Sequence, residues 1–231
     1  LYMKAIRHHC PECLIRARAM DSLTRKELGN LAESCYEIKI NSGEIILKEE
    51  TPGKEVAYLR EGLAKIHKTG PMDKDQILKL VLPGSFVGIQ TLLTQKKHLY
   101  SVTALEESSV CYIEFDFFNK MLLKNAKFGY ELISYISKDE LNYFERMLSH
   151  NQKQVIGRLA DTLLYLSNEV YQSDEFPLSL TRKDLASIIC SSRETVSRAL
   201  VDLQNSKIIK LENKRIRILS KEMILKISRN G

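Results

Sequence analysis

LSLTRKDLASIICSSRETVSRALVDLQNSKIIKLENKRIRIL, residues 178–219, contains two short helical patterns separated by a tight turn. Thr181 stands three residues before Asp184, a spacing that predicts a capping box at the start of the first helix. Cys190 and Ser191 predict the turn. Ser192 is a favoured N-cap residue and predicts the start of the second helix. This order of elements predicts a helix-turn-helix, the unit that places its second helix in the major groove of DNA.

The second helix is predicted to have one apolar and one polar face. Val196, Ala199, Leu200 and Leu203 fall on the first face at helical spacing. Arginine can donate two hydrogen bonds to guanine, and glutamate can accept one from the cytosine amino group. The candidates for base contacts on the polar face are Arg193, Glu194, Ser197 and Arg198. The hydroxyls and cations around them are candidates for contacts with the DNA backbone: Thr181, Arg182, Ser191, Ser192, Thr195, Lys214 and Arg215.

The segment after this helix predicts a two-stranded wing. Apolar residues alternate on both sides of a turn at residues 212–214, as in a hairpin. The last 54 residues contain 12 Lys and Arg against 5 Asp and Glu, whereas residues 1–150 contain 21 against 20. A basic excess confined to one part of a chain is typical of a part that contacts a polyanion. The alternative is an ordinary surface helix in which Glu194 and Arg198 form a solvated i, i+4 pair.

The front of the chain has a different pattern. Between residues 36 and 115, short strand-like segments alternate with turns about every ten residues, which predicts a small antiparallel roll or barrel. Helical spacing follows, with one helix predicted near residues 128–149 and a second near 154–171. The first helix carries an apolar stripe that either packs on its own domain or forms a coiled-coil dimer seam. The stripe consists of Ile133, Ile136, Tyr143 and Met147.

Composition and motifs exclude several classes. The 231-residue chain is 44% hydrophobic and 28% charged, which is typical of a soluble globular protein. It contains no apolar run of the ~20 residues that a membrane-spanning helix requires. We therefore expect a cytoplasmic protein without a membrane partner. The chain has neither a GxxxxGK phosphate loop nor a GxSxG motif, so we do not expect an enzyme.

The motif Ser192-Arg193-Glu194-Thr195-Val196-Ser197-Arg198, together with Thr181-Arg182, resembles the recognition motif of Crp/Fnr-family transcription regulators. This is the group of the cyclic-AMP receptor protein and the fumarate and nitrate reduction regulator. The resemblance implies an α+β fold with a double-stranded β-roll like that of cyclic-nucleotide-binding domains (residues 1–125), a dimerisation helix (126–150) and a winged helix-turn-helix (151–231).

The resemblance also implies how the protein acts. It implies a homodimer on a two-fold symmetric site in double-stranded DNA, with Arg193, Glu194 and Arg198 at the bases and Ser197 tuning the half-site. RNA polymerase is a further expected partner if the protein is an activator. The chain departs from the family at Cys190, because the turn there usually contains glycine.

A second departure concerns the effector. In nucleotide-binding members, a segment similar to residues 84–88 leads to a glutamate that binds ribose, and an Arg-Ser pair downstream holds the cyclic phosphate. Ile89 and His98-Leu99 occupy these positions here. Burying a phosphate without a partner costs several kcal/mol, so we expect an unidentified small-molecule effector other than cyclic AMP. The candidate pocket residues are Phe86, Gly88, Ile89, His98 and Leu99. His98 either binds another anion or serves packing.

The cysteines suggest a different switch. Cys10 and Cys13 resemble the start of the iron–sulfur motif of the oxygen-sensing members, and Cys111 stands where those members have their distal ligand. The remaining ligand position is Ala19, whereas a four-iron cluster takes four thiolates. These three cysteines therefore either bind an iron–sulfur cluster or zinc, or are a relic of such a site.

The other candidate ligands leave this question open. Cys35, His8 or His9 would have to supply the fourth ligand to a cluster or to zinc. We otherwise expect Cys35 and Cys190 to be small buried apolar residues, because free cysteine is among the most buried residue types.

The predicted function is sequence-specific DNA binding in transcription regulation. The alternative from another class is a nucleotide- or metal-binding sensor module that acts through a partner protein. Sequence-selective DNA binding with a strong salt dependence distinguishes the two, because counterion release makes affinity fall as salt rises.

Overall fold

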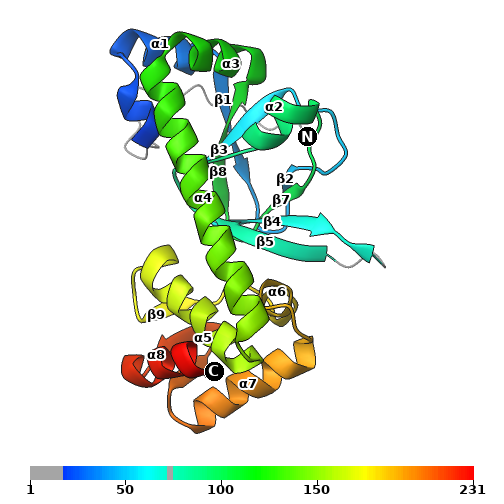
Figure 1. Ribbon diagram of the computed structural model, residues 1–231, viewed down its shortest axis with the longest axis vertical. Helices are drawn as coiled ribbons and strands as arrows, with labels where there is room; N and C mark the ends of the chain where they lie inside the picture. Colours follow the sequence, from blue (N-terminus) through cyan, green and yellow to red (C-terminus); the bar gives the residue numbers. More distant parts are fainter. Residues whose placement is uncertain (1–17, 72–74) are drawn as a thin grey trace. The chain divides into compact units, whose positions relative to one another are not determined.

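The computed structural model describes residues 18–71 and 75–231. The chain forms two compact units, which meet within a long helix at the Glu140–Leu141 bond. We call the part up to Glu140 the roll unit and Leu141–Gly231 the winged unit. Figure 1 shows strands mainly in the first and helices mainly in the second.

Two four-stranded antiparallel sheets form the roll. Their strand orders are β1-β8-β3-β6 and β2-β7-β4-β5. Buried side chains of both sheets, among them Leu59, Val102 and Val110, fill the interior. The strands are β1 (Cys35–Ile40), β2 (Ile45–Leu47), β3 (Glu55–Glu61), β4 (Ala64–Thr69), β5 (Asp75–Val81), β6 (Ser85–Val87), β7 (Ser101–Ala104) and β8 (Ser108–Glu114).

Helices cover one side of the roll and form a second apolar core with it. The rings of Phe86, Phe118 and Phe128 meet in edge contacts there, with centroids 5.6 and 5.8 Å apart. The helical elements are the 3-10 turn η2 (Arg18–Ser22), α1 (Arg25–Glu33), α2 (Ile89–Gln95), α3 (Phe115–Lys124) and the first half of α4 (Ala126–Gln152).

The winged unit packs its helices against a small sheet with strand order β10-β11-β9. Leu159, Phe176, Leu185 and Ile216 are completely buried in its core. The elements are α5 (Val155–Tyr165), the π-helical turn η4 (Leu166–Val170), β9 (Glu175–Pro177), α6 (Arg182–Ile188), α7 (Arg193–Asn205), β10 (Ile209–Glu212), β11 (Arg215–Ile218) and α8 (Lys221–Asn230).

Most predicted elements are confirmed, with three corrections. The helix predicted over residues 154–171 is regular only to Tyr165 and ends in a π-helical turn. The wing has a third strand, β9, and the roll has the short strand β6 followed by helix α2. In the described ranges, no helix is long and apolar enough to cross a bilayer.

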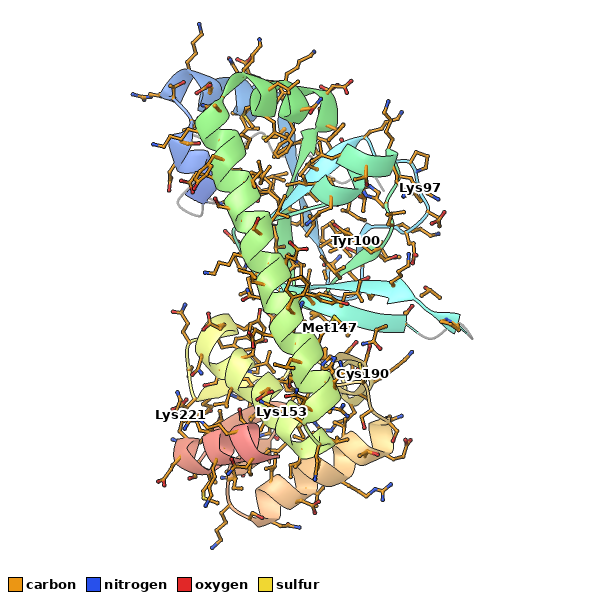
Figure 2. The ribbon with its side chains drawn as sticks, viewed as in Figure 1. Lys97, Tyr100, Met147, Lys153, Cys190 and Lys221 are labelled. Carbon is orange, nitrogen blue, oxygen red and sulfur yellow. The ribbon has the colours of Figure 1, made fainter. Side chains whose placement is uncertain are left out.

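The stripe predicted on α4 divides between two environments. Ile136 is half-buried and packs on the core formed by Phe128 and Leu132, so the start of the helix serves its own unit. Ile133, Tyr143 and Met147 are exposed, and Figure 2 labels Met147 on this helix. Other large apolar side chains of α4 are exposed as well: Tyr130, Leu141, Phe144 and Leu148.

Candidate nucleic-acid interface and effector pocket

The helix-turn-helix begins with the predicted capping box. The hydroxyl of Thr181 accepts a hydrogen bond from the backbone N–H of Asp184 (3.1 Å) and donates its proton to the Asp184 carboxylate (2.6 Å). The same carboxylate accepts the backbone N–H of Thr181 at 2.9 Å. Backbone donors that α6 leaves unsatisfied are thereby paired. The single proton of the Thr181 hydroxyl is used inside the protein, so this side chain acts first as a cap.

The turn between the helices is a Schellman motif. Cys190 has a φ of 51°, its N–H donates to Ser187, and the N–H of Ser191 donates to Ala186. The left-handed conformation explains why this position favours glycine. The expectation that Cys190, labelled in Figure 2, is buried is wrong, because the turn leaves it exposed. Its Sγ lies 3.6 Å from Nδ1 of His150. Cys35 is buried as expected.

The start of α7 combines a cap with the base-contact candidates. The hydroxyl of Ser192 accepts the N–H of Thr195 at 3.1 Å. Val196 and Leu200 are buried against the rest of the unit, while Arg193, Glu194 and Arg198 are exposed. The predicted division of the helix into an apolar and a polar face is confirmed. Ser197 is half-exposed and donates to the carbonyl of Arg193 at 2.9 Å.

Glu194 is held in the ionised form. A hydrogen bond from its own backbone N–H and one from the Ser192 hydroxyl keep its pKa below the ordinary value. An ionised carboxylate only accepts hydrogen bonds, which matches the amino group of a cytosine. Arg198 follows at i+4, so one face of two helical turns presents an acceptor beside a donor.

Arg182, the first residue of α6, has one unsatisfied guanidinium nitrogen among the described residues. Its Nη1 is buried and has no hydrogen-bond partner in the described part of the chain, and burial lowers the pKa of its guanidinium. A buried donor without an acceptor is costly, and because Nη1 is closed to solvent, a phosphate oxygen reaches it only if the side chain moves.

An open groove of about 560 Å³ lies between the start of α5 and α7. Thr195, Arg198 and Asp202 line it from α7, and Gln154 and Ile156 line it from α5. The N-terminus of α5 has no side-chain cap, so the positive end of its dipole is open. The sequence did not predict that α5 lines this groove, because its residues have the pattern of an apolar core helix.

The wing holds its cations differently from the sequence prediction. Glu175 on β9 accepts Nε of Arg215 at 3.3 Å and lies 3.6 Å from Nε of Arg217. Lys210 pairs with Glu212 at 2.8 Å. Lys214 lies in the β10–β11 turn with a φ of 60° and forms no ion pair with described residues. The structure therefore leaves Lys214 open to a phosphate and engages Arg215 with a carboxylate.

Comparison with known proteins matches both units. Residues 37–125 match a cyclic nucleotide-binding domain, and residues 157–227 match a Crp-like helix-turn-helix domain. The chain belongs to the Crp/Fnr family of transcription regulators.

Relatives and solved structures are similar over most of the chain. The "Anaerobic regulatory protein" of Pasteurella multocida is 27% identical over 95% of this chain and 82% of its own length. The "Fumarate and nitrate reduction regulatory protein" of Vibrio cholerae is 27% identical over 95% and 90%. FixK2 from Bradyrhizobium japonicum shares the fold with a TM-score of 0.77 at 20% identity, covering 85% of this chain and 98% of its own. The relatives support a DNA-binding transcription regulator, in a family whose members are not enzymes.

The roll of this Crp/Fnr protein has apolar groups at the expected effector site. Ile89 is 1% exposed and Phe86 is 3% exposed, and both belong to the apolar core. Gly88 has a φ of 91°, and its N–H donates to the hydroxyl of Tyr100 at 2.9 Å. Burial raises the pKa of Tyr100 to about 12. The side chain of Ile89 has no polar group with which to bind a ribose.

His98 fills part of this site itself. Its side chain is 4% exposed, and a Cβ built on Gly53 would lie 3.0 Å from the imidazole. The hydroxyl of Thr91 donates to the carbonyl of Gly88 and lies 3.4 Å from Nδ1 of His98, which makes Nδ1 the donor of that contact. Burial lowers the pKa of His98, so the ring is neutral at pH 7. Between anion binding and packing, these contacts favour packing. Leu99 is half-exposed.

The described residues do not complete a four-thiolate site. Cys10 and Cys13, like His8 and His9, lie outside the described ranges, and Cys111 is half-buried on β8. Ala19 is 4% exposed in the apolar core of the roll unit. In the part of the chain that the structure describes, no three His, Cys, Asp or Glu side chains come together as metal ligands.

We predict that Thr181→Ala destabilises the winged unit by about 1 kcal/mol without DNA, because α6 loses its N-cap. Thr181→Ser, which keeps the hydroxyl, is the matched control. Chemical denaturation of both variants measures the effect. Unchanged stability of Thr181→Ala, together with a loss of DNA affinity, would show that the hydroxyl serves phosphate and not the cap.

We predict that His98 makes the roll sensitive to acid. Because its pKa is lowered from 6.5 in the folded state, the unfolded chain binds the proton more readily, and the free energy of unfolding falls as pH drops below about 6.5. His98→Asn keeps a donor for Thr91 but does not titrate. Denaturation from pH 7.5 to 5.5 should show a flatter pH dependence for this variant, and an unchanged dependence would contradict the assignment.

Proposed function

We propose that this protein acts as a homodimer that reads a two-fold symmetric DNA site through α7, under the control of a small-molecule effector other than cyclic AMP. The observation that carries the proposal is the first two turns of α7, capped by Ser192 and presenting ionised Glu194 beside Arg198 on an exposed face. An acceptor and a fork of donors at this spacing match the edges of neighbouring base pairs in the major groove.

The flanking groups fit contacts with the DNA backbone. Arg182 offers a half-exposed guanidinium, and Lys214 offers an ammonium that forms no ion pair with the described residues. Ser191, Ser192 and Thr195 surround the start of α7, where the dipole favours anions. Thr181 contributes through its cap, and Arg215 reaches a phosphate only when it leaves Glu175. These groups set the register of the protein on the duplex and not its sequence preference.

The exposed stripe of α4 fits a second copy of the chain. Ile133 and Leu141 are 65% and 62% exposed, and Phe144 is 53% exposed. Large apolar groups repeated along one helix are typical of a coiled-coil seam. A symmetric dimer would place two α7 helices on half-sites about one helical turn of DNA apart. Such a protein works in the cytoplasm, and RNA polymerase is its further partner if it activates transcription.

The exclusion of cyclic AMP rests on the side chains at the expected effector site. Ile89, His98 and Leu99 supply no cation for a cyclic phosphate, and desolvating that charge would cost several kcal/mol. A cluster or zinc at Cys10, Cys13 and Cys111 stays a second candidate for the signal. The anaerobic regulators among the relatives favour such a metal site, and the absence of a ligand at Ala19 counts against it.

The test is selection from a randomised duplex library by protein purified with and without air, with iron and zinc counted in each sample. We expect a two-fold symmetric motif. Enrichment only in the anaerobic, iron-containing sample would assign the signal to the cysteines, and the same motif in both samples without metal would assign it to another effector. The absence of a symmetric motif from both samples would contradict the proposal.

Arg198→Ala should weaken binding to the selected duplex by about 1–3 kcal/mol and relax discrimination at one base pair in each half-site, because a bidentate contact is lost. Arg229→Ala on α8 removes the same charge and is the control. Fluorescence anisotropy with the selected duplex and single-base variants measures both effects. Equal weakening on selected and random duplexes would exclude a base contact by Arg198.

A further inference from the structure

The exposed face of the wing carries three cations and two carboxylates. Lys210, Arg217 and Glu175 stand in one row across the three strands, and Glu212 and Arg215 stand in the next row. All five side chains are exposed, because the alternate residues of the strands are turned into the core. Of these cations, Arg215 is the one that the sequence predicts to contact the DNA backbone.

The two carboxylates form ion pairs with these cations. Glu175 divides its two oxygens between two arginines: Oε1 lies 3.3 Å from Nε of Arg215, and Oε2 lies 3.6 Å from Nε of Arg217. Glu212 pairs with Lys210 at 2.8 Å. A carboxylate that holds an arginine by Nε occupies part of the donor fork with which that arginine would grip a phosphate.

These pairs contribute little to stability, because both partners are exposed to water. Glu175 is 45% exposed, and its arginines are 51% and 62% exposed. Ion pairs of this kind are weak and are screened by salt. They can therefore open readily when a phosphate competes for the arginine. The main effect of these ion pairs is to reduce the positive charge that the wing presents to DNA.

We propose that Glu175 is a specificity-determining residue that masks Arg215 and Arg217 from DNA of random sequence. This inference rests on the proposed function of the wing beside α7. Non-specific binding is almost entirely electrostatic, so a carboxylate on the wing weakens it directly. On the correct site, base contacts by α7 hold the wing at the backbone, and the arginines exchange the carboxylate for phosphate. Selectivity rises because the competing complex is weakened.

The test compares Glu175→Gln with the unchanged protein and with Glu222→Gln. Glutamine keeps the size of the side chain and removes its charge. Glu222 lies exposed on α8 and has no ion pair within the described ranges, so its substitution makes the same change in net charge. Full-length variants are titrated by fluorescence anisotropy with the selected duplex and with a scrambled duplex of equal length, over a series of salt concentrations.

We expect Glu175→Gln to bind the scrambled duplex about three-fold or more tightly than Glu222→Gln does. The slope of log affinity against log salt should steepen by about 0.9 for each additional phosphate that the unmasked arginines neutralise. Affinity for the selected duplex should rise less, so the ratio of the two affinities falls. An increase in affinity no larger than that of Glu222→Gln, or an equal increase on both duplexes, would contradict the proposal that Glu175 masks the arginines.

Two further outcomes separate the inference from the proposed function. Weaker binding of Glu175→Gln to both duplexes would show that Glu175 orients the arginines for contact, which contradicts masking but keeps DNA reading intact. Failure of the unchanged protein to prefer the selected duplex would overturn the proposed function and the mask together.

Discussion

The helix-turn-helix depends on the hydrogen bonds that cap the ends of α6 and α7. Both helices are short, and isolated helices of such length are marginal in water. The box between Thr181 and Asp184 starts α6, the left-handed Cys190 ends it, and the Ser192 hydroxyl starts α7. With these ends fixed, burial of Val196 and Leu200 sets the rotation of α7. The exposed positions of Glu194 and Arg198 follow from that rotation.

Local signals in the sequence predicted this part well because each has a short-range physical cause. A cap, a turn residue and a helical period act over a few residues, and all three appear in residues 181–203. Strand β6 and helix α2 were missed because they are short and their apolar residues serve a core assembled from distant segments. The third strand of the wing was missed because Glu175–Pro177 pairs with β11 only in the folded chain.

The ion pairs of the wing are a second feature that the sequence alone could not predict. Composition correctly located the basic excess in the last part of the chain. It could not show that Arg215 and Arg217 share one carboxylate, because Glu175 lies about forty residues earlier and meets them only across the β9–β11 ladder. In the roll, the sequence indicated the loss of phosphate partners, whereas the packing of His98 against Gly53 depends on the tertiary structure.

The proposed function requires that α7 reads bases in the major groove. Methylation of guanine N7 blocks that edge and leaves the rest of the duplex intact, and a bidentate arginine contact requires both N7 and O6. Methylation interference on the selected duplex therefore tests this requirement most directly. We predict symmetric interference at guanines in both half-sites, which Arg198→Ala reduces at one guanine in each. Binding that is indifferent to N7 methylation throughout the site would contradict base reading by α7.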